Sequence, residues 1–219
     1  MLVVLAALLA GFLHVLSGPD HMAAIAPYAI QGKARAWRTG VRWGFGHSAG
    51  VLGVGLLLLT LRDRIGIEAL SSWGERGVGL MLIAIGLWGL RKAIDVRRAK
   101  IDHENHKHSV HGHIAFGVGT IHGLAGSSHL LGIVPALLLP SATAAAAYLI
   151  FFGVGTIAAM GGFAFAVGSI AVPPVARGAA GQSALMGVCS VLALGVGAFW
   201  LISAFGIHTA ASLVALVTP

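Results

Sequence analysis

Residues 13–27 of the chain read LHVLSGPDHMAAIAP, an apolar run that contains two histidines and one aspartate. His14 and His21 are seven residues apart, which is about two turns of an α-helix, so they share one helix face, and Asp20 lies next to it. Ionisable side chains inside a membrane-spanning segment are energetically costly and usually functional. The segment therefore predicts a functional site on the first helix.

A weak point in the predicted helix accompanies these side chains. Pro19 lacks a backbone N–H, so the carbonyl of Val15 loses its usual helical partner. A broken helix inside a membrane is tolerated where it lines a cavity or is buried by protein. We expect the first helix to bend at Gly18-Pro19 and to present a backbone carbonyl to the site.

The same pattern recurs 108 residues later in the chain. Residues 121–135 read IHGLAGSSHLLGIVP, in which His122 and His129 are again seven residues apart, with matching Gly and Pro positions. Chance similarity between Gly-, Ala- and Leu-rich helices is the alternative explanation. The shared histidine spacing favours an internal repeat.

A second, weaker match supports the repeat. GFGHSAG (44–50) is similar to GVGTIAA (153–159), with a threonine in place of His47. Gly46 and Gly50 form a small-xxx-small pair, a pattern that lets membrane helices approach closely. We therefore expect His47 to lie on a helix that packs tightly against a neighbour.

The composition identifies the class of protein. The chain has 219 residues, of which 57% are hydrophobic and 10% charged, and its mean hydropathy is +0.90. A soluble domain carries about 25% charged residues, so a soluble domain, a disordered chain and a nucleic-acid-binding protein are all disfavoured. The single cysteine, Cys189, excludes an internal disulfide.

Six apolar stretches are long enough to cross a bilayer, which takes about 20 residues. They are continuous rather than alternating, which favours helices over a membrane barrel. The stretches are residues 2–30, 41–61, 74–91, 113–139, 143–171 and 183–206. The sequence therefore predicts an all-α integral membrane bundle of six transmembrane helices, the first of them broken.

The basic residues predict the orientation of this bundle. Of the 14 Lys and Arg residues, eleven fall in or beside the first, third and fifth connections and three near the second. Basic residues favour the cytoplasmic side of a membrane. We expect loops 1, 3 and 5 inside the cell, both termini outside, and the chain in the inner (cytoplasmic) membrane.

Three spans in each half force the two halves into opposite orientations. Inverted repeats are common in secondary transporters, whose sites lie near the bilayer midplane at the repeat interface. We expect one transmembrane domain over residues 1–219. It would comprise repeat one at 1–92, a His-rich cytoplasmic loop at 93–112 and repeat two at 113–219.

The intramembrane side chains form a donor set of several imidazoles and one carboxylate. This set suits nickel, cobalt, zinc or copper, whereas magnesium and calcium prefer oxygen ligands. Burial disfavours the charged imidazolium, which prepares a buried histidine for a cation. Interhelical hydrogen bonding is the alternative role for each histidine. The predicted metal ligands are His14, Asp20, His21, His47, His122 and His129.

A second group of histidines lies between the halves. The segment DHENHKHSVHGH (102–113) carries five histidines, and His-rich tracts bind metals with low selectivity. We expect this loop to buffer, sense or hand over a metal; an incidental polar loop is the alternative. Its candidate ligands are His103, His106, His108, His111 and His113.

The tryptophans predict where the helices meet the membrane surface. Trp and Tyr are enriched at membrane–water interfaces, where their rings anchor a helix. Four tryptophans lie close to the ends of predicted spans, and we expect them to act as interfacial anchors. They are Trp37, Trp43, Trp73 and Trp88.

These segments resemble the nickel–cobalt permease (NiCoT, NicO) superfamily, and in particular its short six-span, urease-accessory-like (UreH-like) branch. HVLSGPDHMAAI (14–25) is similar to the family's His…Asp-His signature, although five residues rather than four precede the Asp-His pair. GFGHSAG (44–50) is similar to the family's Gly-His-Ser segment, whereas HGLAGSSH (122–129) replaces its acidic second-half signature. The resemblance implies transport of nickel or cobalt ions. The metal-site residues that it implies are His14, Asp20, His21 and His47.

We therefore predict an alternating-access transporter for Ni²⁺ or Co²⁺ with no enzymatic activity, no prosthetic group and no nucleic-acid partner. Metal efflux, and nickel delivery by a non-transporting accessory protein, are the alternatives. An exporter of small solutes, a proton pathway built on Asp20 and His21, and a thiol carrier are further hypotheses; the lone cysteine disfavours the last. A homo-oligomer and an accessory metallochaperone stay open as partners.

Overall fold

The chain is helical throughout the part that the structure describes. A computed structural model describes residues 1–32, 35–61, 67–98, 110–125, 128–171 and 178–217. These residues form eight helices and no strand, which confirms the all-α prediction. The helices are α1 (Leu2–Ser17), α2 (Pro19–Gly32), α3 (Ala36–Leu61), α4 (Ile67–Arg98), α5 (Val110–Ala125), α6 (Ser128–Leu137), α7 (Ala142–Ile170) and α9 (Ala179–Val217).

Each predicted span coincides with a helix or with a pair of helices. The first predicted span is divided into α1 and α2, and the fourth into α5 and α6. The helices on either side of the His-rich segment extend further into it than expected. Because α4 continues to Arg98 and α5 begins at Val110, helix covers both ends of the segment 93–112.

Several helices are suited to a membrane. Among the described residues, Trp73–Arg97, Ala142–Ile170 and Ala180–Phe205 are each long and apolar enough to cross a bilayer. The pair α1–α2, bent by 74°, passes the same test as one broken span, which gives up to four candidates. The predicted second and fourth spans are not among these. Large apolar side chains lie exposed on α7 and α9, as in surfaces that face lipid.

The first span breaks at Gly18. The backbone N–H of Gly18 donates to the carbonyls of His14, at 3.1 Å, and Val15, at 3.3 Å, and so ends α1. The Gly18 carbonyl accepts from the N–H of His21 at 3.1 Å and so begins α2. The prediction that Val15 presents its carbonyl to the site is wrong, because the chain turns so that Gly18 supplies the donor that Pro19 lacks.

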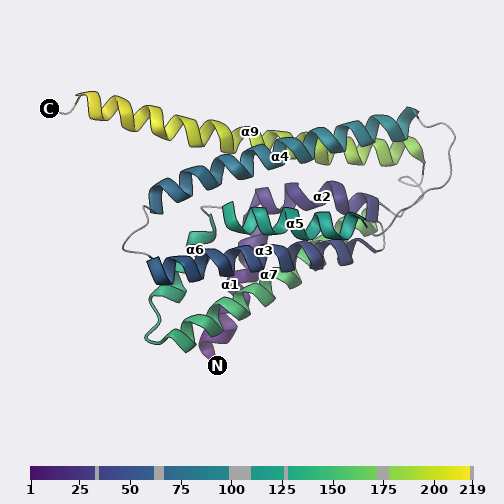
Figure 1. Cartoon of the computed structure of the whole chain (residues 1–219). Helices are drawn as coiled ribbons and strands as arrows, with labels where there is room; N and C mark the ends of the chain where they lie inside the picture. The colour runs from purple at the N-terminus through teal and green to yellow at the C-terminus, as the bar shows by residue number, and fades with distance from the viewer. Residues whose placement is uncertain (33–34, 62–66, 99–109, 126–127, 172–177, 218–219) are drawn as a thin grey trace.

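The two halves of the chain interlock. Helix α1 packs along α7 and α3 packs along α5, so each of these pairs joins the first half to the second. Figure 1 shows α4 and α9 together as a separate pair above these helices. Helix α2 lies between the two groups and contacts α3, α4, α7 and α9.

Glycines form the two seams between the halves. A Cβ added at any of four glycines would collide with a backbone carbonyl of the facing helix, so only glycine permits this approach. On the α1–α7 seam, Gly11 faces the carbonyl of Phe152, and Gly155 faces the carbonyl of Leu8. On the α3–α5 seam, Gly119 faces the carbonyl of Trp43, and Gly46 faces the carbonyl of Phe116. Equivalent partners in the two seams are 108 or 109 residues apart in the numbering. The spacing that relates the two sequence segments therefore also relates the glycine contacts of the two seams, and the close approach predicted for Gly46 and Gly50 is confirmed.

This packing predicts opposite effects for two alanine substitutions. A Cβ at Gly50 would lie 2.5 Å from the carbonyl oxygen of Thr120, whereas a Cβ at Gly117 would have nothing within 4 Å. We expect Gly50→Ala to lower the free energy of unfolding by about 1–3 kcal/mol through overpacking. Gly117→Ala should raise it by up to about 1 kcal/mol through helix propensity. Thermal unfolding in detergent measures both, and equal effects would contradict the seam.

Candidate metal centre

Five of the six predicted ligands converge at the break in the first span. They come from four helices: His14 from α1, Asp20 and His21 from α2, His47 from α3 and His122 from α5. His21, His47 and His122 are fully buried, Asp20 is 2% exposed, and His14 is partly buried. A set of imidazoles and one carboxylate thus occupies the interior of an apolar bundle.

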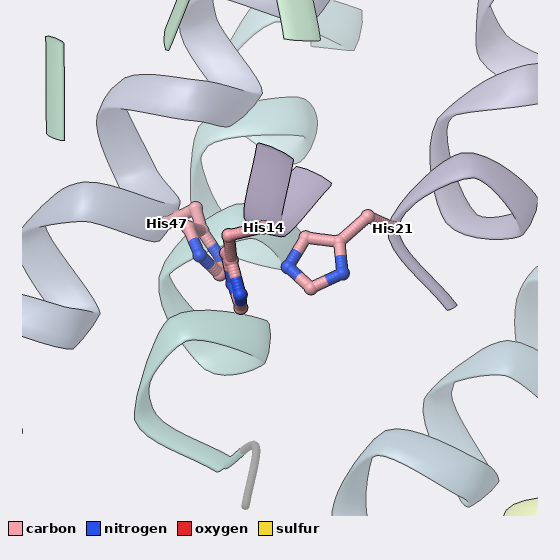
Figure 2. Close-up of side chains that lie close together, drawn as sticks. All are labelled: His14, His21 and His47. Atoms are coloured by element: carbon pink, nitrogen blue, oxygen red, sulfur yellow. The ribbon is translucent and has the colours of Figure 1, made fainter. Parts of the chain in front are cut away.

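Three imidazoles face one another. The ring centroids lie 4.6 Å apart for His14 and His21, 4.9 Å for His21 and His47, and 5.8 Å for His14 and His47. One nitrogen from each ring lies within 4.8 Å of the other two, close enough for a single metal ion. Figure 2 shows the rings of His14 and His47 side by side with His21 opposite them.

The carboxylate of Asp20 lies between two imidazoles. Nδ1 of His21 donates to Oδ1 at 3.0 Å, and Nε2 of His122 lies 3.2 Å from Oδ2. Asp20 is also in the first turn of α2, where the helix dipole favours a negative charge. A proton on Nδ1 of His21 puts the ring's lone pair on Nε2, the arrangement in which a carboxylate orients a metal-binding histidine.

Two candidate metal positions therefore share one residue. The first is formed by His14, His21 and His47. The second is formed by Asp20, His21 and His122, whose ligand atoms also lie within 4.8 Å of one another. Since His21 belongs to both sets, the two candidate positions are adjacent.

Gly18 leaves room for this arrangement. A Cβ at Gly18 would lie 2.9 Å from Oδ1 of Asp20 and would also collide with the ring of His21. The residue that breaks the helix thus allows the carboxylate and the imidazole to fold back against the break.

Two aromatic rings, which the sequence analysis did not assign to the site, form its walls. Trp43 lies parallel to His47, at 8° and 5.3 Å between centroids, and 5.1 Å from the ring of His122. Phe152 lies 5.4 Å from the ring of His14. The prediction that Trp43 is an interfacial anchor is wrong, because its side chain is fully buried. The signal was available: Trp43 precedes His47 by one helical turn, so both share a face.

The other tryptophans differ in exposure. Trp37 and Trp73 are 45% and 70% exposed, as expected for anchors at an interface. Trp88 is partly buried and stacks on Tyr28 at 4.7 Å.

A cavity of about 350 Å³ adjoins the metal centre. His14 and Asp20 reach its wall, whereas the other three imidazoles do not line it. Its remaining lining includes Ser17, Phe152 and Trp200. The cavity therefore borders the cluster at His14 and Asp20.

The other predicted metal ligands are not seen in this cluster in the part of the chain that the structure describes. His129 belongs to α6, but its side chain lies outside the part that the structure describes, as does that of His111 in α5. His103, His106 and His108 lie wholly outside the described residues. His113 is exposed near the start of α5.

Comparison with known proteins finds three relatives. The chain is 38% identical over 206 residues to "Chloroplast protein FOR GROWTH AND FERTILITY 2" of Arabidopsis thaliana, covering 90% of this chain and 55% of the relative. It is 39% identical over 212 residues to "Chloroplast protein FOR GROWTH AND FERTILITY 1" of the same plant, covering 90% and 58%. It is 29% identical over 161 residues to "Urease accessory protein UreH" of Bacillus sp. (strain TB-90), covering 68% and 69%. The chain thus spans little more than half the length of the plant proteins. No family model and no solved structure matches it.

The shared position of His21 predicts a ranking of metal affinities. Loss of an outer partner of a metal site typically costs about 10–100-fold in affinity, so loss of a ligand common to both positions should cost at least ~100-fold. We expect His21→Ala to weaken Ni²⁺ binding more than His14→Ala or His122→Ala does. Isothermal titration of the purified chain in detergent measures the affinities.

The exposed Gln31 supplies the control for this series. Gln31→Ala removes a polar side chain of α2 that belongs to neither ligand set, so its Ni²⁺ affinity should equal that of the unchanged chain. A His21→Ala variant that binds Ni²⁺ like the Gln31→Ala control would contradict the assigned centre.

Proposed function

We propose that the protein transports a divalent transition-metal ion, nickel or cobalt, across a membrane by alternating access. The observation that carries the proposal is the convergence of four imidazoles and one carboxylate on a buried centre beside a cavity, within helices suited to a bilayer. Buried polar groups of this kind inside membrane helices usually mark an ion pathway. No enzymatic reaction and no prosthetic group is part of the proposal.

The donor set supports the choice of ion. Imidazole nitrogen with a single carboxylate suits Ni²⁺, Co²⁺ and Zn²⁺ better than the hard cations Mg²⁺ and Ca²⁺. The one cysteine, Cys189, is partly buried on α9 and is not among the residues grouped at the centre. The ion is therefore held by nitrogen and oxygen, which permits faster exchange than a thiolate cage.

The packing supports six spans arranged as an inverted repeat. The equivalent glycine seams relate α1–α7 to α5–α3, as two halves related by a pseudo-two-fold axis require. In this arrangement α3 and the pair α5–α6 cross the membrane together with α1–α2, α4, α7 and α9. One transmembrane domain over residues 1–219 follows, with the His-rich segment between the repeats.

The seams also suggest which parts move. Because α1, α3, α5 and α7 are joined by close backbone contacts, a rocking of one half against the other would break both seams. Movement of the α4–α9 pair, together with α2, against these four helices preserves them. That movement shifts Asp20 and His21 relative to His14, His47 and His122 and so changes which of the two positions holds the ion.

The distribution of charge supports the orientation. Exposed basic side chains lie at the end of the bundle where α2, α4 and α7 finish and α3, α5 and α9 begin. They are Arg35, Arg38, Arg42, Arg91, Lys92 and Arg97. The positive-inside rule places this end in the cytoplasm and both chain termini on the opposite side of the cell membrane.

The comparisons favour a second candidate function. One relative is named a urease accessory protein, so a membrane protein that binds nickel and delivers it to an enzyme, without transport, is the alternative. Export rather than uptake is the other alternative. The bilayer and the metal ion are the proposed partners, nucleic acid is not, and a homo-oligomer or a metallochaperone would be compatible with either function.

Metal flux into proteoliposomes tests the proposal. We expect the unchanged chain to carry Ni²⁺ or Co²⁺ faster than Mn²⁺, with Zn²⁺ included for comparison. Asp20→Asn keeps the shape of the side chain but removes its charge, and should lower the flux by at least about 10-fold. His21→Ala should lower it further, and Gln31→Ala, on the same helix but outside both ligand sets, should leave it unchanged.

The outcomes separate the candidate functions. Transport by Asp20→Asn and His21→Ala at the rate of the unchanged chain would contradict the assigned site. Tight Ni²⁺ binding with no flux for any metal would favour the accessory function over the transporter.

A further inference from the structure

A groove lies on the outer face of the bundle, and none of the candidate metal ligands is part of its lining. It measures about 580 Å³ and runs between α3 and α7, within the range of about 300–1,000 Å³ that is usual for ligand pockets. Its lining is apolar, and its residues on α3 recur at every fourth position, so they form one stripe. These are Trp37, Val41 and Phe45, facing Val154, Ile157 and Phe165 on α7.

Two glycines keep the groove open. Gly161 and Gly162 line it from α7 and contribute no side chain to fill it. A Cβ at Gly162 would have nothing within 4 Å, so the space beside it is open. Along α7 the lining extends from Val154 to Phe165, which is roughly 16 Å at the rise of an α-helix. The groove therefore runs along the helices, the direction in which an acyl chain lies in a bilayer.

The groove has a basic mouth. Trp37 lines its end nearest the start of α3, and the guanidinium of Arg38 lies 5.5 Å from the centroid of the Trp37 ring. Arg42 follows Arg38 by one helical turn and shares its face. Both arginines are exposed, and neither belongs to an ion pair recorded among the described side chains.

We propose that this groove is a binding site for one anionic phospholipid. The acyl chain occupies the apolar channel between α3 and α7, and the phosphate of the headgroup meets the guanidinium groups of Arg38 and Arg42. Trp37 lies between the two parts, at the depth where a headgroup meets its acyl chain, and tryptophan favours that boundary. A zwitterionic lipid carries its own cation beside the phosphate, so two arginines favour a lipid with a net negative charge.

This site is independent of the metal centre and does not rest on the proposed transport. A lipid in the groove would contact both α3, which carries His47, and α7, which packs against α1. It would therefore act on the packing of these two helices. Arginine guanidinium groups recognise phosphate with strong charge-assisted hydrogen bonds. Each basic residue near an anionic membrane surface strengthens binding by roughly fivefold.

The test measures which lipid stays bound to the chain. The protein is reconstituted in vesicles of equal phosphatidylglycerol and phosphatidylcholine, extracted into mild detergent, and examined by native mass spectrometry. We expect one retained phosphatidylglycerol in preference to phosphatidylcholine. The double variant Arg38→Gln/Arg42→Gln should lose this preference by roughly fivefold for each arginine removed.

A groove-filling variant tests the apolar channel separately. Gly162→Leu places a side chain in the open space and should remove the bound lipid. Gly195→Leu on α9 is the matched control, because its Cβ also meets nothing within 4 Å, and it should keep the lipid. Equal thermal unfolding of the two leucine variants establishes that the comparison concerns binding rather than folding.

Three results would overturn the proposal. The first is equal retention of the two lipids by the unchanged chain. The second is retention of phosphatidylglycerol by Gly162→Leu at the level of the Gly195→Leu control. The third is a dimer that carries no lipid and dissociates on Gly162→Leu, which would make the groove an interface between two copies of the chain.

Discussion

The buried carboxylate of Asp20 is the constraint on which the rest of the centre depends. A charge at 2% exposure in an apolar bundle must be compensated by nearby groups. Its two oxygens lie 3.0 and 3.2 Å from the imidazoles of His21 and His122, and it stands at the N-terminal end of α2. The helix break at Gly18 supplies both that helix terminus and the space for the carboxylate. The helix break, the carboxylate and the two imidazoles therefore depend on one another, and a bound cation would further compensate the charge of Asp20.

Residues 108 or 109 positions apart in the two halves share their packing contacts but differ in their polar side chains. The glycine seams and the walls formed by Trp43 and Phe152 have equivalents in both halves, which preserves the scaffold. At the repeat position of His47 stands Thr156, whose hydroxyl donates to the carbonyl of Gly11 at 3.3 Å. At that of Asp20 the second half has a serine. Among the described residues, the polar groups of the first half thus gather with His122 at one centre.

Much of this arrangement could be predicted from the sequence. Hydropathy located the helices, and the spacing of His14 and His21 with the proline indicated a broken helix with its ligands at the break. Small-xxx-small spacing identified the packing of Gly46 correctly. Trp43 was assigned wrongly, because closeness to the end of an apolar run does not reveal whether a side chain faces lipid or the interior.

The sequence does not predict that the ligands form two overlapping sets. It depends on the 74° bend between α1 and α2 and on the angles at which four helices meet, and no periodicity in a single chain encodes those angles. The hydrogen bond from the N–H of Gly18 to the carbonyl of Val15 could not be predicted for the same reason, since it depends on how tightly the chain turns.

The placement of the ligands across the helices argues for a particular division of labour. His14, His47 and His122 belong to α1, α3 and α5, which are closely packed at the α1–α7 and α3–α5 seams, with α3 also packed against α7. Asp20 and His21 belong to α2, which also contacts α4 and α9. A backbone carbonyl packed on a glycine tolerates little displacement, whereas α2 follows the break at Gly18 and contacts both the seam helices α3 and α7 and the pair α4–α9. In the proposed transport, His21 is therefore the ligand that a movement of α2 displaces relative to both His14 and His122, the residues with which it forms the two candidate positions.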